Sequence, residues 1–300
     1  MFSIIIVSFN ARAVLQSCLK SIQIHEPEAQ VIVVDNDSRD GSYEMVSREF
    51  PWVTLLQMGK NAGFAAANNA GLAMATKPFV VLLNSDTELS DDSLSRCVRR
   101  LQKDRTLGAV HPRLTGPDGK PQLCEHSAPS LADVARKAVR MQPLDQGVRW
   151  LAGTALVIRK TALDNVGHGL DDNYFMYWED ADLSARLQAA GWKLDVEPLA
   201  DIKHLGGASG GGPDASRRAD LYAWYLWGKH RWFRRNRPFW EATALWMFDA
   251  FDVARKFARG IRHSSRRKGE WSHARVTASV LCLILLQRHP RKPAVRTGGS

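Results

Sequence analysis

Four apolar runs of strand length recur in the first part of the chain, at residues 4–7, 31–34, 53–56 and 79–83. Runs that are apolar throughout are typical of strands covered on both faces of a sheet. The intervals between them are long enough for helices, and the alanine-rich segment 63–75 has a strong helix propensity. The sequence therefore predicts an α/β fold with a mostly parallel central sheet.

Three of these runs end in polar residues that could bind a ligand: Asn10, Asp35, Asp37, Asn84 and Asp86. The carboxyl ends of the strands in an open α/β sheet form the ligand crevice, so we expect these side chains to gather along one rim. Any one of them could instead start a turn or cap a helix. Because three strand ends share the pattern, a ligand site is the better interpretation.

The chain has no glycine loop for binding phosphate. The first run is followed by SFNARAVL, without G-x-G-x-x-G, and no G-x-x-x-x-G-K-[ST] motif occurs. Carboxylates that bind Mg²⁺ or Mn²⁺ offer another way to bind a diphosphate, because the metal neutralises the charge of the diphosphate. Asp86 is well placed to offer one of the oxygen ligands.

Positive charge is concentrated at the C-terminal end of the chain. Residues 214–300 hold 19 Lys and Arg against 6 Asp and Glu, whereas residues 1–213 hold 22 against 25. A glycine-rich loop at 204–213 precedes this change in composition. We therefore expect a catalytic domain over residues 1–213 and a basic, tryptophan-rich helical tail over residues 214–300.

The cysteines and the N-terminus indicate a cytoplasmic protein. The four cysteines show neither C-x-x-C spacing nor a dense framework, so we expect reduced thiols. The apolar run at 4–7 is too short for a signal peptide or a spanning helix.

Seven motifs occur in the same order as in a known family. They read SIIIVSFN, VIVVDNDSRDGS, NAGFAAANN, LLNSDTE, WLAGTALVIRK, FMYWEDADLSARLQAAGW and IKHLGGAS, and the resemblance covers about residues 2–210. The chain thereby resembles the glycosyltransferases of family 2, and within them the bacterial rhamnosyltransferase-like branch. The resemblance implies a GT-A fold, a nucleotide-diphosphate sugar donor, a divalent metal (Mg²⁺ or Mn²⁺) and inversion at the anomeric carbon.

The resemblance also implies a role for individual residues. Asp180 would be the general base, and Asp86 and His204 would hold the metal. Asn84 stands where a D-x-D-type motif has its first aspartate. The donor would be bound by Asn10, Asp35, Asp37, Asn61 and Asn84, with Asp35 at the nucleoside. The acceptor would be bound by Trp150, Gly153 and Glu179.

The segment around Asp180 can also be interpreted from its spacing. If a helix begins near Asp180, Leu183 and Leu187 fall on the same face as that carboxylate, which therefore points inward. Asp180 could alternatively be a helix N-cap. One carboxylate within hydrogen-bond reach of an acceptor hydroxyl suffices as general base for a single inverting displacement.

The tail combines aromatic and basic residues. Six of the ten tryptophans lie in residues 214–300, interleaved with Arg231, Arg234, Arg235 and Arg237. Nucleic acid, an anionic membrane or an acidic protein could bind such a surface, and we favour the membrane because no nucleic-acid motif is present. The apolar run at 278–286 is too short to span a bilayer but could lie on one. A helical appendage packed on the catalytic domain is the alternative.

Together these features predict a cytoplasmic glycosyltransferase, peripheral on the inner face of the cell membrane. It would transfer a sugar, with dTDP-rhamnose as one candidate donor, to a lipid-linked glycan acceptor in surface polysaccharide synthesis. A nucleotidyltransferase on a similar fold and a binding protein with a degraded transferase site are the alternatives. The first would require a basic glycine-rich loop after the first strand, which is absent, and retention of Asp35, Asp86, Asp180 and His204 argues against the second.

Overall fold

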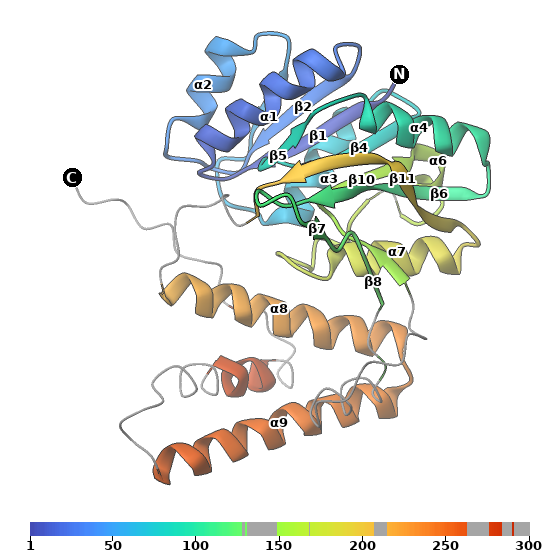
Figure 1. Cartoon of the computed structure of the whole chain (residues 1–300). Helices are drawn as coiled ribbons and strands as arrows, with labels where there is room; N and C mark the ends of the chain where they lie inside the picture. Colours follow the sequence, from blue (N-terminus) through green and yellow to red (C-terminus); the bar gives the residue numbers. More distant parts are fainter. Residues whose placement is uncertain are drawn as a thin grey trace. The chain divides into compact units, whose positions relative to one another are not determined.

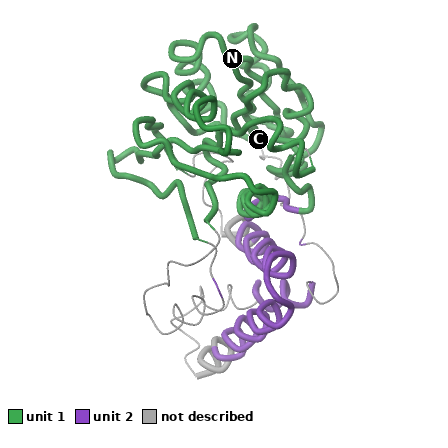
Figure 2. Tube along the Cα trace, turned by 90° about the vertical axis from the view of Figure 1, so that its right-hand side faces the viewer, with its two compact units in different colours: residues 1–128, 146–173, 179–212 green, residues 129–145, 174–178, 213–300 purple. Residues whose placement is uncertain are grey.

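A computed structural model describes residues 1–127, 130, 149–167, 169–206, 215–262, 276–283 and 290. The chain divides into two compact units, which are coloured separately in Figure 2. One comprises Met1–Ala128, Gln146–Asn173 and Glu179–Gly212; the other comprises Pro129–Asp145, Tyr174–Trp178 and Pro213–Ser300. The boundary that we predicted after residue 213 lies outside the described residues.

The first unit is built on a nine-stranded sheet with the order β3-β2-β1-β4-β10-β6-β11-β5, in which β7 pairs with β6 (Figure 1). The four apolar runs form its parallel part, as β1 (Ser3–Ser8), β2 (Gln30–Asp35), β3 (Thr54–Gln57) and β4 (Phe79–Asn84). The sheet is mixed beyond β4, through β5 (Thr87–Leu89), β6 (Leu107–Thr115), β7 (Pro121–Gln122), β10 (Ala155–Arg159) and β11 (Lys193–His204). The predicted α/β fold class is confirmed: β1, β2, β3 and β4 pair in parallel, and so do β6 and β11.

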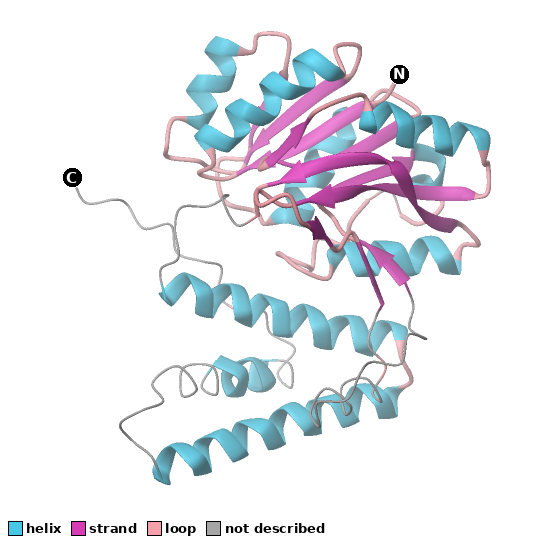
Figure 3. Ribbon diagram, in the orientation of Figure 1, coloured by secondary structure: helices cyan, strands magenta, loops and turns pink. Residues whose placement is uncertain are grey.

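Helices cover both faces of this sheet (Figure 3). Successive side chains of a strand point to opposite faces, so Ile4 and Ile6 are buried in one cluster and Ile5 in another. The first cluster includes residues of α1 (Arg12–His25), α2 (Ser42–Glu49) and α4 (Ser93–Lys103). The second includes residues of α3 (Phe64–Met74), α6 (Lys160–Asp164) and α7 (Glu179–Ala189). Burial on both faces explains why these strands are apolar throughout.

Helix α3 approaches the sheet closely because Gly71 has no side chain. A Cβ at this position would lie 2.4 Å from Cγ2 of Ile5 and 3.1 Å from Cγ2 of Val34. The short distance leaves no room for a methyl group. The alanine-rich sequence therefore serves close packing on β1 and β2, in addition to its helix propensity.

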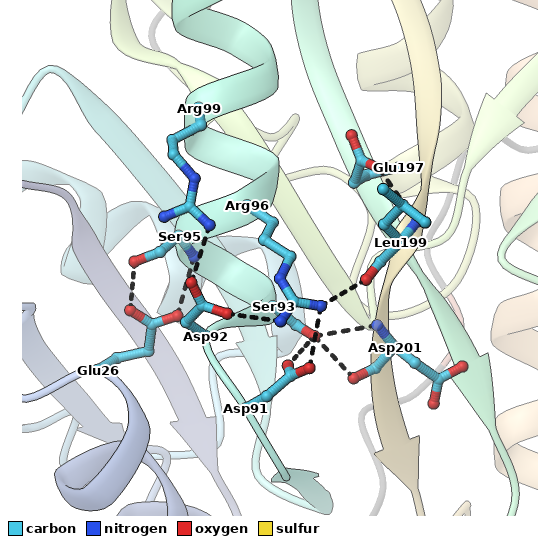
Figure 4. Close-up of polar contacts among 10 residues, drawn as sticks. All are labelled: Glu26, Asp91, Asp92, Ser93, Ser95, Arg96, Arg99, Glu197, Leu199 and Asp201. Carbon is cyan, nitrogen blue, oxygen red and sulfur yellow. Dashed lines mark hydrogen bonds and ion pairs between the residues drawn. The ribbon is translucent and has the colours of Figure 1, made fainter.

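A polar network fixes the N-terminus of α4 and an irregular part of β11 (Figure 4). The buried carboxylate of Glu26 accepts hydrogen bonds from the backbone N and hydroxyl of Ser95, at 2.9 Å and 2.5 Å. Ser93 Oγ accepts a hydrogen bond from Asp201 N at 3.0 Å. This bond lies where the register of β11 shifts between Glu197 and Asp201. The network therefore positions the last part of β11, which ends at His204.

The second unit is helical. It contains α8 (Ala215–Asn236), α9 (Phe239–Arg262), the helical residues 276–283 and Tyr174–Trp178. Its apolar cluster joins Phe175, Trp224, Trp227 and Val280, and the rings of Phe175 and Trp224 stack with centroids 4.8 Å apart. Helix α8, residues 276–283 and Tyr174–Trp178 thus share this core.

Several tryptophans that we expected to face a membrane are buried. Trp224, Trp227 and Trp232 are at most 7% exposed, so the expectation was wrong for these tryptophans. The guanidinium of Arg231 lies over the ring of Trp227 and that of Arg237 over the ring of Trp232, at 5.5 Å and 5.6 Å. Such cation–π contacts stabilise the unit and engage both arginines.

The described part of the apolar run at 278–286 has one buried side and one exposed side, because Ser279 and Cys282 are exposed. Val280 and Leu281 are 1% and 5% exposed. Residues 284–286 lie outside the described part of the chain. No helix among the described residues has both the length and the hydropathy needed to cross a membrane.

The Glu26 contact can be tested through stability. We expect Glu26→Ala to lower the free energy of unfolding by about 1–3 kcal/mol, because the partly buried N–H and hydroxyl of Ser95 lose their acceptor. Denaturant unfolding would measure the change. Glu28→Ala, at an exposed residue of the same turn, is the control and should change stability by less than about 0.5 kcal/mol. Equal effects of both changes would contradict the assigned role of Glu26.

Candidate active site

The predicted ligand residues follow strand ends that lie side by side. Ser8 is in register with Asp35 across β1 and β2, and Val7 is in register with Asn84 across β1 and β4. The carboxyl ends of these three parallel strands therefore meet at one edge. Asn10, Asp35, Asp37, Asn84 and Asp86 lie at or just beyond that edge, as the sequence pattern predicts.

Asp35 offers a buried oxygen to this edge. The residue is 1% exposed, and Oδ2 accepts a hydrogen bond from Ser38 N at 3.0 Å. Oδ1 is buried and accepts no hydrogen bond from any described residue. Burial is the main cause that raises the pKa of this carboxyl above its ordinary value. Asp35 Oδ1 can therefore accept a hydrogen bond from a donor group of a bound ligand.

Asn10 and Asp37 shape the loops around Asp35. Both have positive φ angles, 49° and 71°, which asparagine and aspartate tolerate better than most residues. Asn10 Oδ1 accepts a hydrogen bond from Arg39 N at 2.8 Å, and Asn10 N donates to Ser38 Oγ at 3.0 Å. The Asn10 side chain therefore ties the loop after β1 to the loop after β2.

Asn36 is a further residue of this edge that the sequence analysis did not single out. It is 3% exposed, and its side chain donates to Asn61 Oδ1 at 3.0 Å and accepts from Ala62 N at 2.9 Å. Asn61 Oδ1 also accepts from Gly63 N at 3.0 Å. The two asparagines fasten the loop before α3 to the end of β2. The signal for Asn36 was its place between two aspartates in VDNDS.

Asp86 and His204 are brought together by strand pairing. In the antiparallel pair of β5 and β11, Thr87 is opposite His204, and Leu205 N donates to Asp86 O at 2.9 Å. Nε2 of His204 lies 3.5 Å from Oδ1 of Asp86, an oxygen that is buried and accepts no hydrogen bond from any described residue. The two residues predicted to hold a metal therefore face each other.

Gln122, which the sequence analysis missed, fixes the orientation of the His204 ring. Its Oε1 lies 2.8 Å from Nδ1 of His204, and its Nε2 donates to the backbone O of His204 at 3.2 Å. Because Oε1 can only accept, Nδ1 carries the proton, which leaves Nε2 as the ring nitrogen that faces Asp86. Two acceptor atoms at this distance need a cation or a proton between them.

This donor set fits a divalent cation. A carboxylate oxygen and an imidazole nitrogen both bind Mn²⁺. Two ligand atoms 3.5 Å apart, as Asp86 Oδ1 and His204 Nε2 are, can also bind one Mg²⁺ at about 2.1 Å from each. The described residues include no cluster of three or more His, Cys, Asp or Glu that could hold an ion. Further ligands would thus come from substrate or water, as is usual for Mg²⁺.

Asp180 lies at the start of α7 and points inward, as predicted. Its Oδ2 accepts a hydrogen bond from Gly153 N at 3.0 Å, and its Oδ1 accepts from Ala181 N at 2.8 Å. Burial is the main cause that raises the pKa of this carboxyl above 3.8, and the two backbone donors oppose the rise. A carboxylate with a raised pKa and a fixed orientation is suited to accept a proton.

Glu179, the preceding residue, is more strongly perturbed. Its side chain is buried, and Oε2 accepts no hydrogen bond from any described residue. Burial, followed by the negative charge of Asp180, raises the pKa of Glu179 well above its ordinary value. Glu179 therefore keeps its proton to a higher pH than an exposed glutamate does.

Gly153 and Trp150 lie close together in the segment whose backbone donates a hydrogen bond to Asp180. A Cβ at Gly153 would lie 3.6 Å from both Cβ of Asp180 and Cε1 of Phe64, which is an ordinary contact. Gly153 thus acts in the structure through its backbone N–H. Trp150 lies on β9 (Arg149–Leu151), opposite His126 on β8 (Glu125–Ser127), and the two rings stack with centroids 5.2 Å apart.

His126 is another residue that sequence reasoning missed. It is partly exposed, and its electrostatic interaction with Asp180 lowers the pKa of that carboxyl, so the two groups are within electrostatic range. The hairpin of β8 and β9 is fixed to α7 because Leu151 N donates to Ser184 Oγ at 3.3 Å. A partly exposed aromatic pair therefore lies on the hairpin that leads to the Asp180 contact.

His111 supports the site from within the sheet. It is fully buried on β6, where Nε2 accepts a hydrogen bond from Ala155 N at 3.3 Å and Nδ1 donates to Pro112 O at 2.5 Å. Burial lowers the pKa of His111 to about 4, so its ring is neutral at physiological pH. The neutral ring ties the start of β10 to β6.

Among proteins of known function, an N-acetylglucosaminyl-diphospho-decaprenol L-rhamnosyltransferase of Mycobacterium tuberculosis is 28% identical over 298 residues, which cover 88% of this chain and 95% of that protein. A poly-beta-1,6-N-acetyl-D-glucosamine synthase of Staphylococcus epidermidis is 27% identical over 209 residues, or 66% of this chain and 48% of the relative.

Solved structures show the same fold. A mannosyltransferase from Pyrobaculum calidifontis, in complex with GDP-Man and Mn²⁺, superposes with a TM-score of 0.57 at 17% identity, over 96% of this chain and 87% of its own. S. aureus TarS 1–349 superposes with a TM-score of 0.54 at 15% identity, over 96% of this chain and 92% of its own. The predicted GT-A fold is thereby confirmed.

Residues 3–167, more than half of the chain, match the family model described as glycosyl transferase family 2. Since the match spans the strand ends at which Asp35 and Asp86 lie, the chain is a glycosyltransferase that belongs to this family.

Proposed function

We propose that this glycosyltransferase moves a sugar, with L-rhamnose as the first candidate, from a nucleotide-diphosphate donor to an N-acetylglucosaminyl-diphospho-polyprenol acceptor. The support for the sugar and the acceptor is the printed name of the mycobacterial relative, which this chain matches along 88% of its length. The observation that carries the proposed chemistry is the partly buried Asp180 carboxylate, whose Oδ2 accepts a hydrogen bond from Gly153 N at 3.0 Å.

The donor end would be bound at the ends of β2 and β4. Asp35 Oδ1, which accepts no bond from the described residues, would accept a hydrogen bond from the nucleoside. Asp86 and His204 would hold the divalent cation, Mg²⁺ or Mn²⁺, that neutralises the charge of the diphosphate. Asn10 and Asn61 would act indirectly, because both side chains hold the loops that border Asp35.

The reaction is a single displacement. The acceptor hydroxyl oxygen forms a bond to the anomeric carbon as the bond from that carbon to the donor diphosphate breaks. Asp180 accepts the hydroxyl proton, and the nucleoside diphosphate leaves with the bonding electron pair. Attack opposite the leaving group inverts the anomeric configuration. Asp180 has a further lone pair on each oxygen for this proton, beyond the bonds from Gly153 and Ala181.

The acceptor sugar would lie against the hairpin of β8 and β9. The stacked rings of His126 and Trp150 offer an amphipathic surface of the kind that packs on a pyranose ring. Glu179, which tends to keep its proton, could donate a hydrogen bond to the acceptor and orient it. Because the acceptor is a lipid, the enzyme would work in the cytoplasm at the inner surface of the membrane.

A panel of nucleotide sugars, screened for Mn²⁺-dependent release of nucleoside diphosphate in the presence of the polyprenyl acceptor, tests the proposal. We expect Asp180→Asn to retain donor affinity and to lower kcat by ~10²-fold or more, since an amide cannot accept the proton.

Asp118→Asn, at an exposed turn, is the matched control and should keep wild-type turnover. Release of nucleoside diphosphate by no sugar in the panel would contradict the proposed function. Unchanged kcat in Asp180→Asn would remove Asp180 as the base.

The role of Gln122 can be measured without turnover. We expect Gln122→Leu to weaken Mn²⁺ binding by about 10-fold or more, because His204 loses the acceptor that sets its tautomer and ring orientation. Free Mn²⁺ measured by electron paramagnetic resonance, with nucleoside diphosphate present, would give the affinity. Gln122→Glu retains an acceptor and should bind more tightly than Gln122→Leu. Gln23→Leu, on the exposed side of α1, serves as the control, and equal affinity in all four proteins would refute the assignment.

A further inference from the structure

Helix α9 has an exposed apolar side. Trp240, Met247, Phe248 and Phe251 fall at i, i+7, i+8 and i+11, which is the spacing of one helix face. Trp240, Met247 and Phe251 are 60–69% exposed, and Phe248 is 40% exposed. Phe239, at the first position of the helix, is 85% exposed. Large apolar side chains exposed together are uncommon on a soluble protein and mark an interaction surface.

The opposite side of α9 is already occupied. Ala242 and Leu245 are 7% and 0% exposed. Asp249 Oδ2 lies 2.7 Å from Nζ of Lys229 and 2.8 Å from Nε2 of His230, both on α8. Burial lowers the pKa of His230, while its contact with Asp249 opposes this shift. The contacts of Asp249 with α8 set the orientation of α9 about its own axis, and the apolar side therefore remains exposed.

Positive charge borders the N-terminal end of this side. Arg234 and Arg235 are exposed in the last turn of α8, directly before the turn that leads to Phe239 and Trp240. Residues 215–262 contain 11 Lys and Arg against 4 Asp and Glu, a net charge of +7. Arg231 and Arg237, which contact aromatic rings, are not part of the exposed group.

We infer that the exposed side of α9, with Arg234 and Arg235, is the surface by which the protein binds an anionic lipid bilayer. An amphipathic helix with aromatic residues on one side and cations at its border lies in the plane of the headgroups. Trp240 would settle at the headgroup level, and the two arginines would contact lipid phosphates.

The inference rests on the proposed function in one respect, since a polyprenyl-linked acceptor supplies the reason for membrane binding. The surface itself is recognised from the exposure of α9 and the charge beside it. A nucleic acid would not require the exposed Met247 side chain, because it is bound through phosphate charge and the stacking of bases on aromatic rings. A second copy of the chain or a protein partner is an outcome that the experiment distinguishes.

Vesicle co-sedimentation tests the inference with full-length protein. The vesicles are phosphatidylglycerol mixed with phosphatidylcholine, or phosphatidylcholine alone, at low and high salt. We expect binding to the anionic vesicles that high salt weakens, and at least about tenfold weaker binding in Trp240→Gln/Phe251→Gln. Arg234→Gln/Arg235→Gln should lose binding mainly to the anionic vesicles. Leu199→Gln, which changes a leucine of the first unit that is 76% exposed, should bind like wild type.

Two results would overturn the inference: no wild-type binding to anionic vesicles, or equal binding by wild type and Trp240→Gln/Phe251→Gln. A wild-type dimer that this double substitution converts to a monomer, with vesicle binding unchanged, would also overturn it and identify the surface as a self-association site. Loss of vesicle binding in the variant, together with no sugar transfer by any of the proteins, would support the inference and contradict the proposed function alone.

Discussion

The site depends on four consecutive backbone units, from Ala152 to Ala155, that are each bonded to a different part of the first unit. Ala152 N donates to Cys124 O, Gly153 N to Asp180 Oδ2, and Ala155 N to His111 Nε2, while Thr154 O accepts from Asn84 N. These bonds link the β8–β9 hairpin, α7, β6 and the end of β4. In the proposed reaction the Asp180 carboxylate must be held relative to the donor sugar, and this segment connects Asp180 to the end of β4.

Much of the fold and part of the site follow from the sequence, because burial leaves a periodic pattern. The uninterrupted apolar runs of β1, β2 and β4 predicted strands covered on both faces, and their register brings Asp35 and Asn84 to one edge. The spacing of Asp180 with Leu183 and Leu187 predicted its inward orientation, since both leucines are fully buried. The roles of these residues in binding and catalysis remain predictions.

Other features depend on tertiary contacts that leave no local pattern. Gln122 reaches His204 across 82 positions of sequence, and His126 meets Trp150 through a two-stranded sheet closed by a long connection. The charge and the aromatic content of the tail predicted a binding surface. They could not predict that Trp232 is buried and that Trp240 is exposed. Only the packing of α8 and α9 makes that distinction. The same packing engages Arg231 and Arg237 and leaves Arg234 and Arg235 at the surface.

The central claim is that Asp180, held by Gly153, is the proton acceptor of the transfer reaction. Nuclear magnetic resonance of glycine-labelled protein tests it, because the Gly153 amide reports the ionisation of the carboxylate that it contacts. The account predicts that this resonance titrates with a pKa above 3.8, and that the acid limb of the kcat/KM profile has the same midpoint. A Gly153 amide that does not titrate, or a midpoint that differs from the rate profile by more than about one pH unit, would contradict it.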